Sequence, residues 1–452
     1  MFRWSSVRLL SAHVWFYPIF IFMKKALLLL LAAVTAISCR EGRDTAMTSR
    51  MDSSRLNIGT YILQPYARSE AHIKDLADCG IDFVICIDND RAALDLFSKY
   101  GVGAIVTGVV PGWWGGDGNN AGTLRTSHPL EEYEAAAAAF EDHPAIWGID
   151  IGDEPSALDF PYYGEVYKKV DELFPNQFPF LNLYPNYASV AQNTDEQTVN
   201  QLGTATYQEH IDRYCECVPA YYLSYDFYYK VAGVEKDYDN LRVVADACRK
   251  NGLEMWVTVQ VNSYDPEVWI CENELRFQAY SALAFGAVNL TWACYTAGWW
   301  NNLVLDAEGN RTQQYDKLKR VNAEIHTLAD HYMKYKTEET AFVGFAGTSV
   351  PEECGIETIE TLDWGRLSEL TAGCPLVVGK MVQRGGGRGR ALFVCVADDP
   401  YDENPQQHTL SFRAKGRKIK AYGGDGPIEV TSTGPGSYEI PVTSNQGLLI
   451  EY

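Results

Sequence analysis

The sequence predicts an α/β protein, a (β/α)8 TIM barrel followed by a small all-β sandwich domain. Between residues 56 and 336, eight short apolar runs alternate with amphipathic segments, the pattern of a parallel sheet whose strands are joined by helices. Their span of roughly 280 residues matches the size of a closed barrel. From residue 337 to 452 no helical pattern persists, and short apolar runs alternate with Gly, Pro and Asp turns, as in a β-sandwich.

The first half of the barrel region contains four strand–helix units. We expect strands at residues 56–63, 83–87 and 103–110 and within 148–155, and helices at 69–79, 91–100 and 129–141. Gly80 and Gly101 follow the first two helices, where a left-handed C-terminus favours glycine.

The second half repeats the pattern. Strands are expected at 178–184, 221–225, 254–261 and 287–294, with helices at 162–174, 206–217, 237–251, 272–285 and 313–336. A doubly wound open sheet is the competing architecture. It would require a glycine-rich phosphate turn after the first strand, and Gly59-Thr60-Tyr61 is not one.

The N-terminus has the features of an export signal. Met23-Lys24-Lys25 is followed by the apolar run 26–37 and then by Ser38-Cys39. Residues 36–39 resemble a bacterial lipobox, which makes residues 1–39 a lipoprotein signal. The resemblance implies that the segment before Cys39 is removed and that Cys39 becomes the lipidated first residue. The protein would then be anchored in the bacterial cell envelope, either periplasm-facing or at the cell surface. We expect Met23 to be the true initiator. The polar segment 40–55 would be a tether. A plain secretory signal or an uncleaved anchor is the alternative to the lipoprotein signal.

The charge of the chain argues against a nucleic-acid partner. The formal net charge is −21, so a polyphosphate would be repelled and a neutral or cationic ligand is easier to accommodate. Cys215-Glu216-Cys217 is too tightly spaced for the usual zinc pairs and has no accompanying histidine cluster. We therefore predict no metal and no cofactor.

The segment 148–155, Gly-Ile-Asp-Ile-Gly-Asp-Glu-Pro, organises the predicted barrel. Its apolar strand ends in Asp153 and Glu154, and Pro155, which lacks an N–H, cannot continue a sheet ladder. Glu154 would therefore project from the carboxyl end of strand four, where a barrel enzyme keeps its catalytic groups. The alternative is that both carboxylates belong to an ordinary loop or cap the next helix.

The other strand ends supply aromatic, carboxylic and amide side chains. Aromatic rings stack on the C–H faces of sugars, and carboxylates and amides hydrogen-bond to hydroxyls, so the set suits an oligo- or polysaccharide better than a phosphate or a lipid. The predicted binding residues are Tyr61, Asp88, Trp113, Trp114, Asp153, Asn182, Tyr184, Asn186, Tyr228, Gln260, Asn262, Tyr295, Trp299 and Trp300, with Asp90 and Asp226 at the same face.

The barrel region resembles the superfamily of (β/α)8 glycoside hydrolases. Members often place their acid/base glutamate at the end of strand four as Asn-Glu-Pro or Asp-Glu-Pro, which Asp153-Glu154-Pro155 matches here. Residues 272–280 and 284–287, and the stretch 305–310 with Tyr315 and the following helix, look like the same region of β-galactosidase-like bacterial lipoproteins. The resemblance covers residues 56–336 and implies an exported glycoside hydrolase with Glu154 as general acid.

One departure affects the mechanism. The superfamily places its nucleophile glutamate at the end of strand seven, but residues 257–263 contain no carboxylate. Glycoside hydrolysis normally needs a second carboxyl group. Asp226 is our first choice for it, with Glu272 and Asp153 as alternatives, although Glu272 could instead cap its helix.

Two other functions remain open. The first is a glycan-binding lipoprotein on a barrel that has lost its nucleophile. The second is a lyase or isomerase, which would need a metal or phosphate site that the sequence does not indicate. The run 384–390, Arg-Gly-Gly-Gly-Arg-Gly-Arg, has the composition of a phosphate- or RNA-binding loop, but we predict a hairpin tip between two strands.

Anchoring through Cys39 can be tested directly. Cys39→Ser should move the protein from the membrane fraction to the soluble fraction, because it removes the acceptor of the lipid, while its melting temperature should stay the same. Fractionation followed by immunoblotting measures the partition. Equal solubility of the two forms would remove the lipoprotein interpretation.

Overall fold

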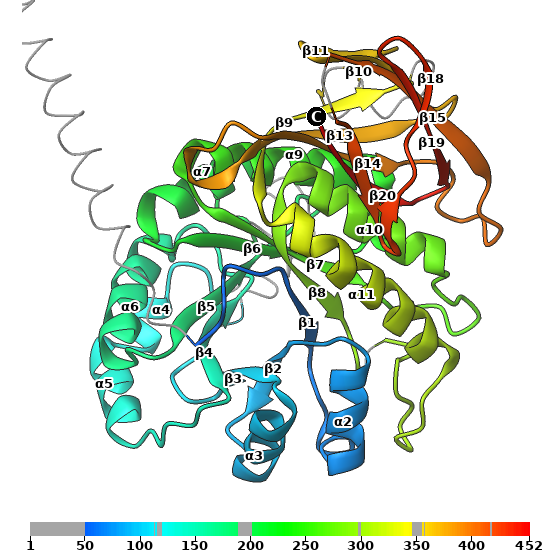
Figure 1. The fold of residues 1–452 in the computed structure, drawn as a ribbon. Coiled ribbons are helices and arrows are strands. Elements are labelled where there is room, and N and C mark those ends of the chain that lie inside the picture. Colours follow the sequence, from blue (N-terminus) through cyan, green and yellow to red (C-terminus); the bar gives the residue numbers. More distant parts are fainter. Residues whose placement is uncertain are drawn as a thin grey trace, which may run out of the picture. The chain divides into compact units, whose positions relative to one another are not determined.

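The computed structural model describes residues 50–112, 114, 120–188, 201–296, 300–345, 355–356, 358–415 and 418–452. Eight strands form a closed parallel barrel in chain order, and β1 pairs with β8 to close it (Figure 1). The strands are β1 (Asn57–Tyr61), β2 (Phe83–Asp88), β3 (Gly103–Thr107), β4 (Ile146–Asp153), β5 (Phe178–Leu183), β6 (Tyr222–Asp226), β7 (Glu254–Gln260) and β8 (Ala287–Ala293). The predicted barrel is therefore confirmed.

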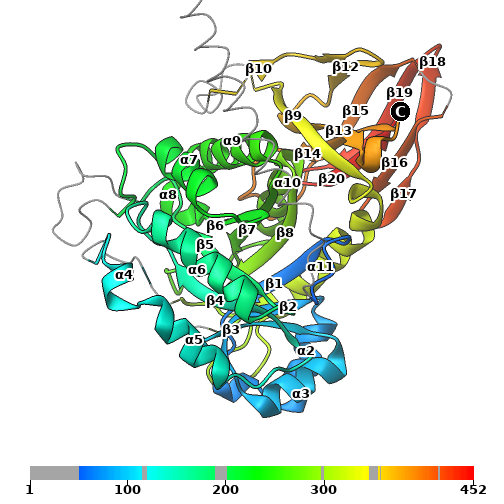
Figure 2. The ribbon, with the colours of Figure 1, turned by 90° about the vertical axis from the view of Figure 1, so that its left-hand side faces the viewer.

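Helices connect the strands around the outside of the barrel (Figure 2). They are η1 (Pro65–Ala67), α2 (Glu70–Asp78), α3 (Arg91–Tyr100), α4 (Leu124–Ser127), α5 (Leu130–Ala138), α6 (Phe160–Leu173), α7 (Tyr207–Cys217), α8 (Tyr229–Ala232), α9 (Val234–Asn251), α10 (Glu272–Phe285) and α11 (Gln313–Tyr332). The predicted bounds of α3 and α10 are correct, whereas the helix expected to reach Lys336 ends at Tyr332. It ends earlier because Tyr335 already begins strand β9 of the sandwich.

The pairing of the barrel strands shifts register at four places, and two of these β-bulges bear on the candidate site. In β4, Asp150 pairs with Phe180 and Asp153 pairs with Asn182, so Ile151 is an extra residue relative to β5. A bulge shifts the phase of the side chains that follow it. Asp150 and Asp153, three positions apart, are thereby turned to the same side of the sheet. In β2 the extra residue is Cys86, which adopts a left-handed φ of 56°.

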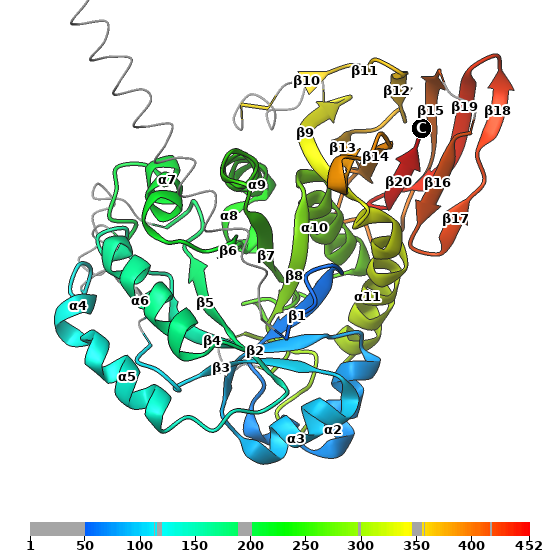
Figure 3. The ribbon, with the colours of Figure 1, turned by 60° about the vertical axis from the view of Figure 1, so that its left-hand side comes forward.

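The C-terminal sandwich contains a seven-stranded and a five-stranded sheet (Figure 3). The larger sheet has the order β10-β9-β13-β14-β20-β16-β17 and the smaller one β11-β12-β15-β19-β18. The strands are β9 (Tyr335–Val343), β10 (Thr358–Ile359), β11 (Leu362–Trp364), β12 (Leu367–Thr371), β13 (Leu376–Gln383), β14 (Arg390–Val396), β15 (Gln407–Ala414), β16 (Lys420–Gly423), β17 (Gly426–Ile428), β18 (Thr431–Gly434), β19 (Ser437–Thr443) and β20 (Gly447–Glu451). A β13–β14 hairpin brackets residues 384–389, as predicted.

Helix α10 is shared by the two domains. It packs on β7 and β8 of the barrel and on β13 and β14 of the sandwich, and nearly all of its side chains are buried. Gly379 of β13 allows the closest approach, because a Cβ at that position would overlap with the carbonyl oxygen of Ala284. Within the described part of the chain, no helix combines the length and apolar composition needed to cross a membrane.

The close packing of α10 generates a stability prediction. Gly379→Ala should lower the free energy of unfolding by about 1–3 kcal/mol, because the added methyl group must displace the backbone of α10. Gly434→Ala is the matched control, since a Cβ there meets no atom within 4 Å and the backbone of Gly434 is not in the left-handed region. Chemical denaturation measures both. Equal stability of the two variants would show that the contact between β13 and α10 is not tight.

Candidate active site

A cavity of about 790 Å³ opens at the carboxyl ends of the barrel strands. Four acidic side chains line it, and the described lining contains no lysine or arginine. The lining residues are Tyr61, Ile85, Cys86, Thr107, Gly112, Trp114, Asp150, Gly152, Asp153, Glu154, Phe180, Asn182, Tyr187, Asp226, Tyr228, Val231, Thr258 and Tyr264. This end of a (β/α)8 barrel is where enzymes with the fold carry their active sites.

Asn182 connects the carboxylates of two strands. Its Nδ2 group donates a hydrogen bond of 2.8 Å to Asp226 Oδ1 and one of 3.3 Å to Asp153 Oδ1. Ser224 Oγ donates to Asn182 Oδ1 at 2.8 Å and so fixes the orientation of the amide. The two acceptor oxygens are therefore held on either side of one nitrogen.

Glu154 has an unusual backbone conformation. Its φ is 45°, in the left-handed region that a side chain rarely occupies, and its N–H donates to the carbonyl oxygen of Asn182 at 2.9 Å. Such strain concentrates at functional sites. The indole Nε1 of Trp114, a residue that is 67% exposed, donates to Glu154 Oε2 at 3.2 Å. The conformation and this hydrogen bond together aim the carboxyl group at the mouth of the cavity.

Burial raises the pKa of all four acidic groups. For Glu154 the pKa lies well above its usual range because of burial first, and then because of the charges of Asp226 and Asp153. Burial and the charge of Asp153 raise the pKa of Asp226 to about 7. Burial also raises the pKa of Asp153, although hydrogen bonds from Asn182 and Tyr61 oppose the effect. The site can therefore hold protons at neutral pH.

Asp150 lies deeper in the cavity than the strand ends and is 8% exposed. Its Oδ1 accepts a hydrogen bond of 3.1 Å from the N–H of Gly152, and Cys86 Sγ lies 3.6 Å from its Oδ2. Burial, followed by the charge of Asp153, raises the pKa of Asp150 to about 7. The bulges of β2 and β4 thus contribute to the same part of the cavity wall.

Aromatic side chains surround the mouth. Tyr264 is 53% exposed and stacks on Trp300, with ring centroids 4.1 Å apart and an interplanar angle of 16°. Trp300 also packs edge-on against Tyr228, at 4.9 Å. The buried Trp300 thus supports both lining tyrosines from behind, and its predicted role at the site is indirect.

The structure brings some of the predicted site residues to the cavity and places others elsewhere. Those that line the cavity are Tyr61, Trp114, Asp153, Glu154, Asn182, Asp226 and Tyr228. Those that do not are Asp88, Tyr184, Asn186, Gln260, Asn262, Glu272 and Tyr295, besides Trp300. Trp113, Trp299 and Cys39 lie outside the described residues.

Two acidic residues that were predicted at the site, Asp88 and Glu272, form ion pairs outside the cavity. Asp88 accepts hydrogen bonds of 2.7 and 2.9 Å from Arg68, and it points to solvent. Glu272 stands in the first turn of α10, where Arg320 Nε donates to it at 2.8 Å and Arg276 at 3.0 Å. Although burial opposes the effect, these two arginines hold the pKa of Glu272 below its usual value. Glu272 is thus a structural carboxylate rather than part of the cavity.

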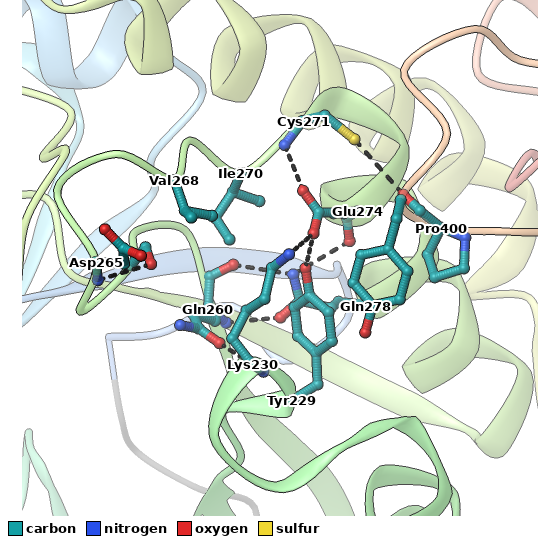
Figure 4. Close-up of polar contacts among 12 residues, drawn as sticks. Tyr229, Lys230, Gln260, Asp265, Val268, Ile270, Cys271, Glu274, Gln278 and Pro400 are labelled. Atoms are coloured by element: carbon teal, nitrogen blue, oxygen red, sulfur yellow. Dashed lines mark hydrogen bonds and ion pairs between the residues drawn. The ribbon is translucent and has the colours of Figure 1, made fainter.

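The predicted amide side chains that lie outside the cavity form hydrogen bonds with the backbone. Asn262 Nδ2 donates to the carbonyl oxygen of Cys294 at 2.8 Å, and the side chain of Asn186 bonds to the backbone of Lys236 and to Asp239. Gln260 accepts from the N–H of Lys230 at 3.1 Å (Figure 4). These residues do stand at strand ends, as predicted, but they orient the loops around the cavity. Tyr184 and Tyr295 are buried in the core.

A buried cluster below the rim holds α8 in place (Figure 4). Glu274 forms an ion pair with Lys230 and accepts hydrogen bonds of 2.6 Å from Tyr229 and 2.7 Å from the N–H of Cys271. Lys230 also lies 4.5 Å above the ring of Tyr401, in the loop between β14 and β15 of the sandwich. The loop after β6, which carries Tyr228 and Val231 into the cavity, is therefore anchored to both domains.

The sequence interpretation did not identify seven polar or aromatic lining residues. They are Cys86, Thr107, Asp150, Phe180, Tyr187, Thr258 and Tyr264. Asp150 could have been suspected as the one acid inside an apolar strand, since a buried acid needs a reason. Cys86 could not have been found, because its position depends on a bulge set by pairing with β3.

Among the described residues, no group of three or more His, Cys, Asp and Glu side chains is arranged to hold an ion.

A scan against protein-family models and a search of the curated proteins give no match to the sequence. Several solved structures with a similar fold are glycoside hydrolases. One is a candidate alpha-L-fucosidase from Bacteroides thetaiotaomicron, with a TM-score of 0.43 and 14% identity over 60% of this chain and 94% of that one. A glucosidase from Croceicoccus marinus has a TM-score of 0.40 and 10% identity, over 88% and 95% of the two chains. A family 5 mannosidase from Rhizomucor miehei has a TM-score of 0.38 and 12% identity, over 61% and 94%. Similarity at this level concerns the fold alone.

The buried Asp150 predicts a pH dependence of stability. Its pKa is about 7 in the folded protein and about 3.9 when unfolded, so the folded state binds the extra proton between these values. The contribution of this proton to the free energy of unfolding is therefore fully present below the unfolded pKa. It is lost as the pH rises to 7, at about 1.4 kcal/mol per pH unit. Asp150→Asn removes this loss, and its stability relative to the wild type should rise by about 3 kcal/mol between pH 5 and pH 8.

Denaturation curves at the two pH values measure this difference. Asp330→Asn, at an exposed aspartate, is the control and should leave the pH dependence unchanged. Parallel curves for the wild type and Asp150→Asn would contradict a buried proton at this position.

Proposed function

We propose that this protein is an exported glycoside hydrolase that acts on an external or periplasmic glycan. The observation that carries the proposal is the convergence of Glu154 and Asp226 on one aromatic-rimmed cavity at the carboxyl end of a (β/α)8 barrel. Hydrolysis of a glycosidic bond needs one carboxyl group that is protonated and a second that is ionised. Burial raises the pKa of both carboxyl groups, and that of Asp226 lies at about 7, so Asp226 can be ionised near neutral pH.

Glu154 acts as the general acid. Burial and the neighbouring charges of Asp226 and Asp153 raise its pKa well above the usual range, which favours the protonated form that a general acid needs. The Trp114 indole donates to Oε2 and leaves the other oxygen to deliver the proton to the leaving group. The position at the end of β4 agrees with the Asp-Glu-Pro resemblance.

Asp226 activates the attacking water as general base. It stands at the end of β6, and β5 separates β6 from β4. Two interstrand spacings amount to roughly 9–10 Å between the backbones, which leaves space for a water beside the sugar. This geometry favours inversion, for which the two carboxyl groups lie about 6.5–9.5 Å apart. Asn182 holds Asp226 toward the cavity.

A saccharide suits the remaining wall. Trp114 and Tyr264 present exposed ring surfaces at the mouth, and Tyr61, Asn182 and Asp153 present hydroxyl, amide and carboxylate groups below. A neutral sugar does not need a counter-charge, and the described lining offers no cation. The predicted signal and lipobox, with Cys39 as the lipidated residue, would bring this cavity to glycans outside the cytoplasm.

A non-catalytic glycan-binding lipoprotein is the second candidate. The observation in its favour is that β7 contributes Thr258 to the cavity and no carboxylate. Digestion of a broad glycan panel separates the two functions. Binding of a glycan by the wild type without release of product from any member of the panel would favour the second candidate.

The different roles of the two carboxyl groups predict that their variants differ in how the loss of turnover depends on the leaving group of the substrate. Glu154→Gln should reduce turnover by roughly 10²–10⁴-fold but spare substrates whose leaving group needs no protonation. Asp226→Asn should be equally damaging on every substrate, because no leaving group replaces the attacking base. Steady-state kinetics on aryl and alkyl glycosides measures both, and Glu267→Gln, an exposed acid after β7, is the control.

The anomeric form of the first product, observed by NMR, should be inverted. A retained product would exclude Asp226 as a base acting through water. Near-normal turnover in Asp226→Asn, combined with an inactive Glu272→Gln, would show that Glu272 of α10 and not Asp226 is the second catalytic carboxyl group.

A further inference from the structure

A second concavity, of about 420 Å³, lies on the sandwich beside the hairpin that joins β13 to β14. We call it the hairpin groove. Lys336, Arg384 and Arg390 line it together with one acid, Glu338. Gly385 and Gly386 have open space where a Cβ would stand, so their backbone is open to a ligand.

Strand register places two of these cations on one face of the sheet. Val382 of β13 pairs with Lys336 of β9 on one side and with Arg390 of β14 on the other. Directly paired residues of neighbouring strands point to the same face. Lys336 and Arg390 therefore flank Val382 at roughly 10 Å from backbone to backbone, and Arg384 begins the turn at the end of the groove.

These cations form no ion pair in the part of the chain that the structure describes. The charge of Arg384 does act on the buried Glu254, and Arg384 Nε donates to the carbonyl oxygen of Tyr335 at 2.8 Å. No ion pair within 4 Å joins Lys336, Arg384, Arg388 or Arg390 to a described acid, and Glu338 forms none either. Elsewhere in the same sheet Lys380 pairs with Glu339. In a chain whose formal net charge is −21, four unpaired cations around one short hairpin are a marked local excess of positive charge.

The hairpin groove lies at the opposite end of the barrel from the candidate active site. Tyr332, the last residue of α11, donates to the carbonyl oxygen of Ala287, the first residue of β8. Arg384 N–H donates to the carbonyl oxygen of Lys334, two residues further along the chain. The groove therefore stands near the amino ends of the strands, while the catalytic candidates stand at the carboxyl ends.

We propose that the hairpin groove binds a phosphate group. A guanidinium presents a rigid fork of donors that matches phosphate oxygens, and a lysine adds a point charge. Here the cations approach from three sides, along β9, along β14 and from the turn. A tetrahedral phosphate directs acceptor oxygens toward all three at once, whereas a planar carboxylate would satisfy fewer of them.

The contrast between the basic hairpin groove and the acidic remainder of the protein would orient the protein on an anionic surface. A strongly acidic protein is repelled by an anionic surface everywhere except at a basic patch. A phosphate held in the hairpin groove would therefore leave the carboxyl end of the barrel facing away from the source of that phosphate. Two sources share the chemistry, free phosphate and the headgroup of an anionic phospholipid.

Isothermal titration calorimetry on the full chain tests the proposal. The probes are inorganic phosphate and a short-chain, water-soluble phosphatidylglycerol, with the zwitterionic phosphatidylcholine of the same length as the neutral comparison. The test variant is Lys336→Gln combined with Arg390→Gln. The control variant is Arg366→Gln combined with Lys415→Gln, which removes the same charge from two exposed cations beside the paired strands β12 and β15.

We expect saturable binding by the wild type, at least tenfold weaker in the test variant and within twofold of the wild type in the control. Binding of inorganic phosphate identifies a free phosphate site, and binding of phosphatidylglycerol alone identifies a headgroup site; both support the proposal. Melting temperatures of both variants should equal that of the wild type, since all four substituted side chains are exposed. No saturable binding of either probe, or equal weakening in both variants, would overturn it.

Discussion

The burial of four carboxyl groups at one end of a closed barrel is the constraint on which the rest of the site depends. Carboxylates resist burial, and each of Asp150, Asp153, Glu154 and Asp226 responds with a raised pKa. No described cation in the cavity wall compensates them. The protein instead supplies neutral donors, chiefly the amide of Asn182 between two strands. Such a site stores protons near neutrality, which is what acid–base chemistry requires.

The backbone is distorted where the carboxyl groups converge. The extra residue in β4 turns Asp150 and Asp153 to one side, and Glu154 follows with a left-handed φ. A left-handed residue with a side chain costs roughly 1–3 kcal/mol, and it persists only where the surroundings hold it. Here the N–H of Glu154 is bound by the carbonyl oxygen of Asn182 and its carboxyl group by Trp114. The contacts that hold Glu154 in this strained conformation also position its carboxyl group, the proposed acid.

The sandwich is part of the support for the cavity. Helix α10 packs against both domains, and Glu274 in its first turn gathers Lys230, Tyr229 and the backbone of Cys271. The sandwich residue Tyr401 covers Lys230 from outside. The loop after β6 is therefore fixed by contacts that reach from the cavity rim to the second domain, and its Tyr228 and Val231 have a rigid base.

The sequence by itself determined the eight strand–helix units, the sandwich and the carboxyl ends of the strands as the place for chemistry. These follow from local properties, namely apolar periodicity, glycine at helix ends and a proline that stops β4. Only the tertiary structure decided which strand-end side chains meet. Arg68 captures Asp88, and Arg276 and Arg320 capture Glu272, whereas the bulges bring in Cys86 and Asp150. Strand register and the choice of charge partner depend on residues far apart in the chain, and a local pattern contains no record of them.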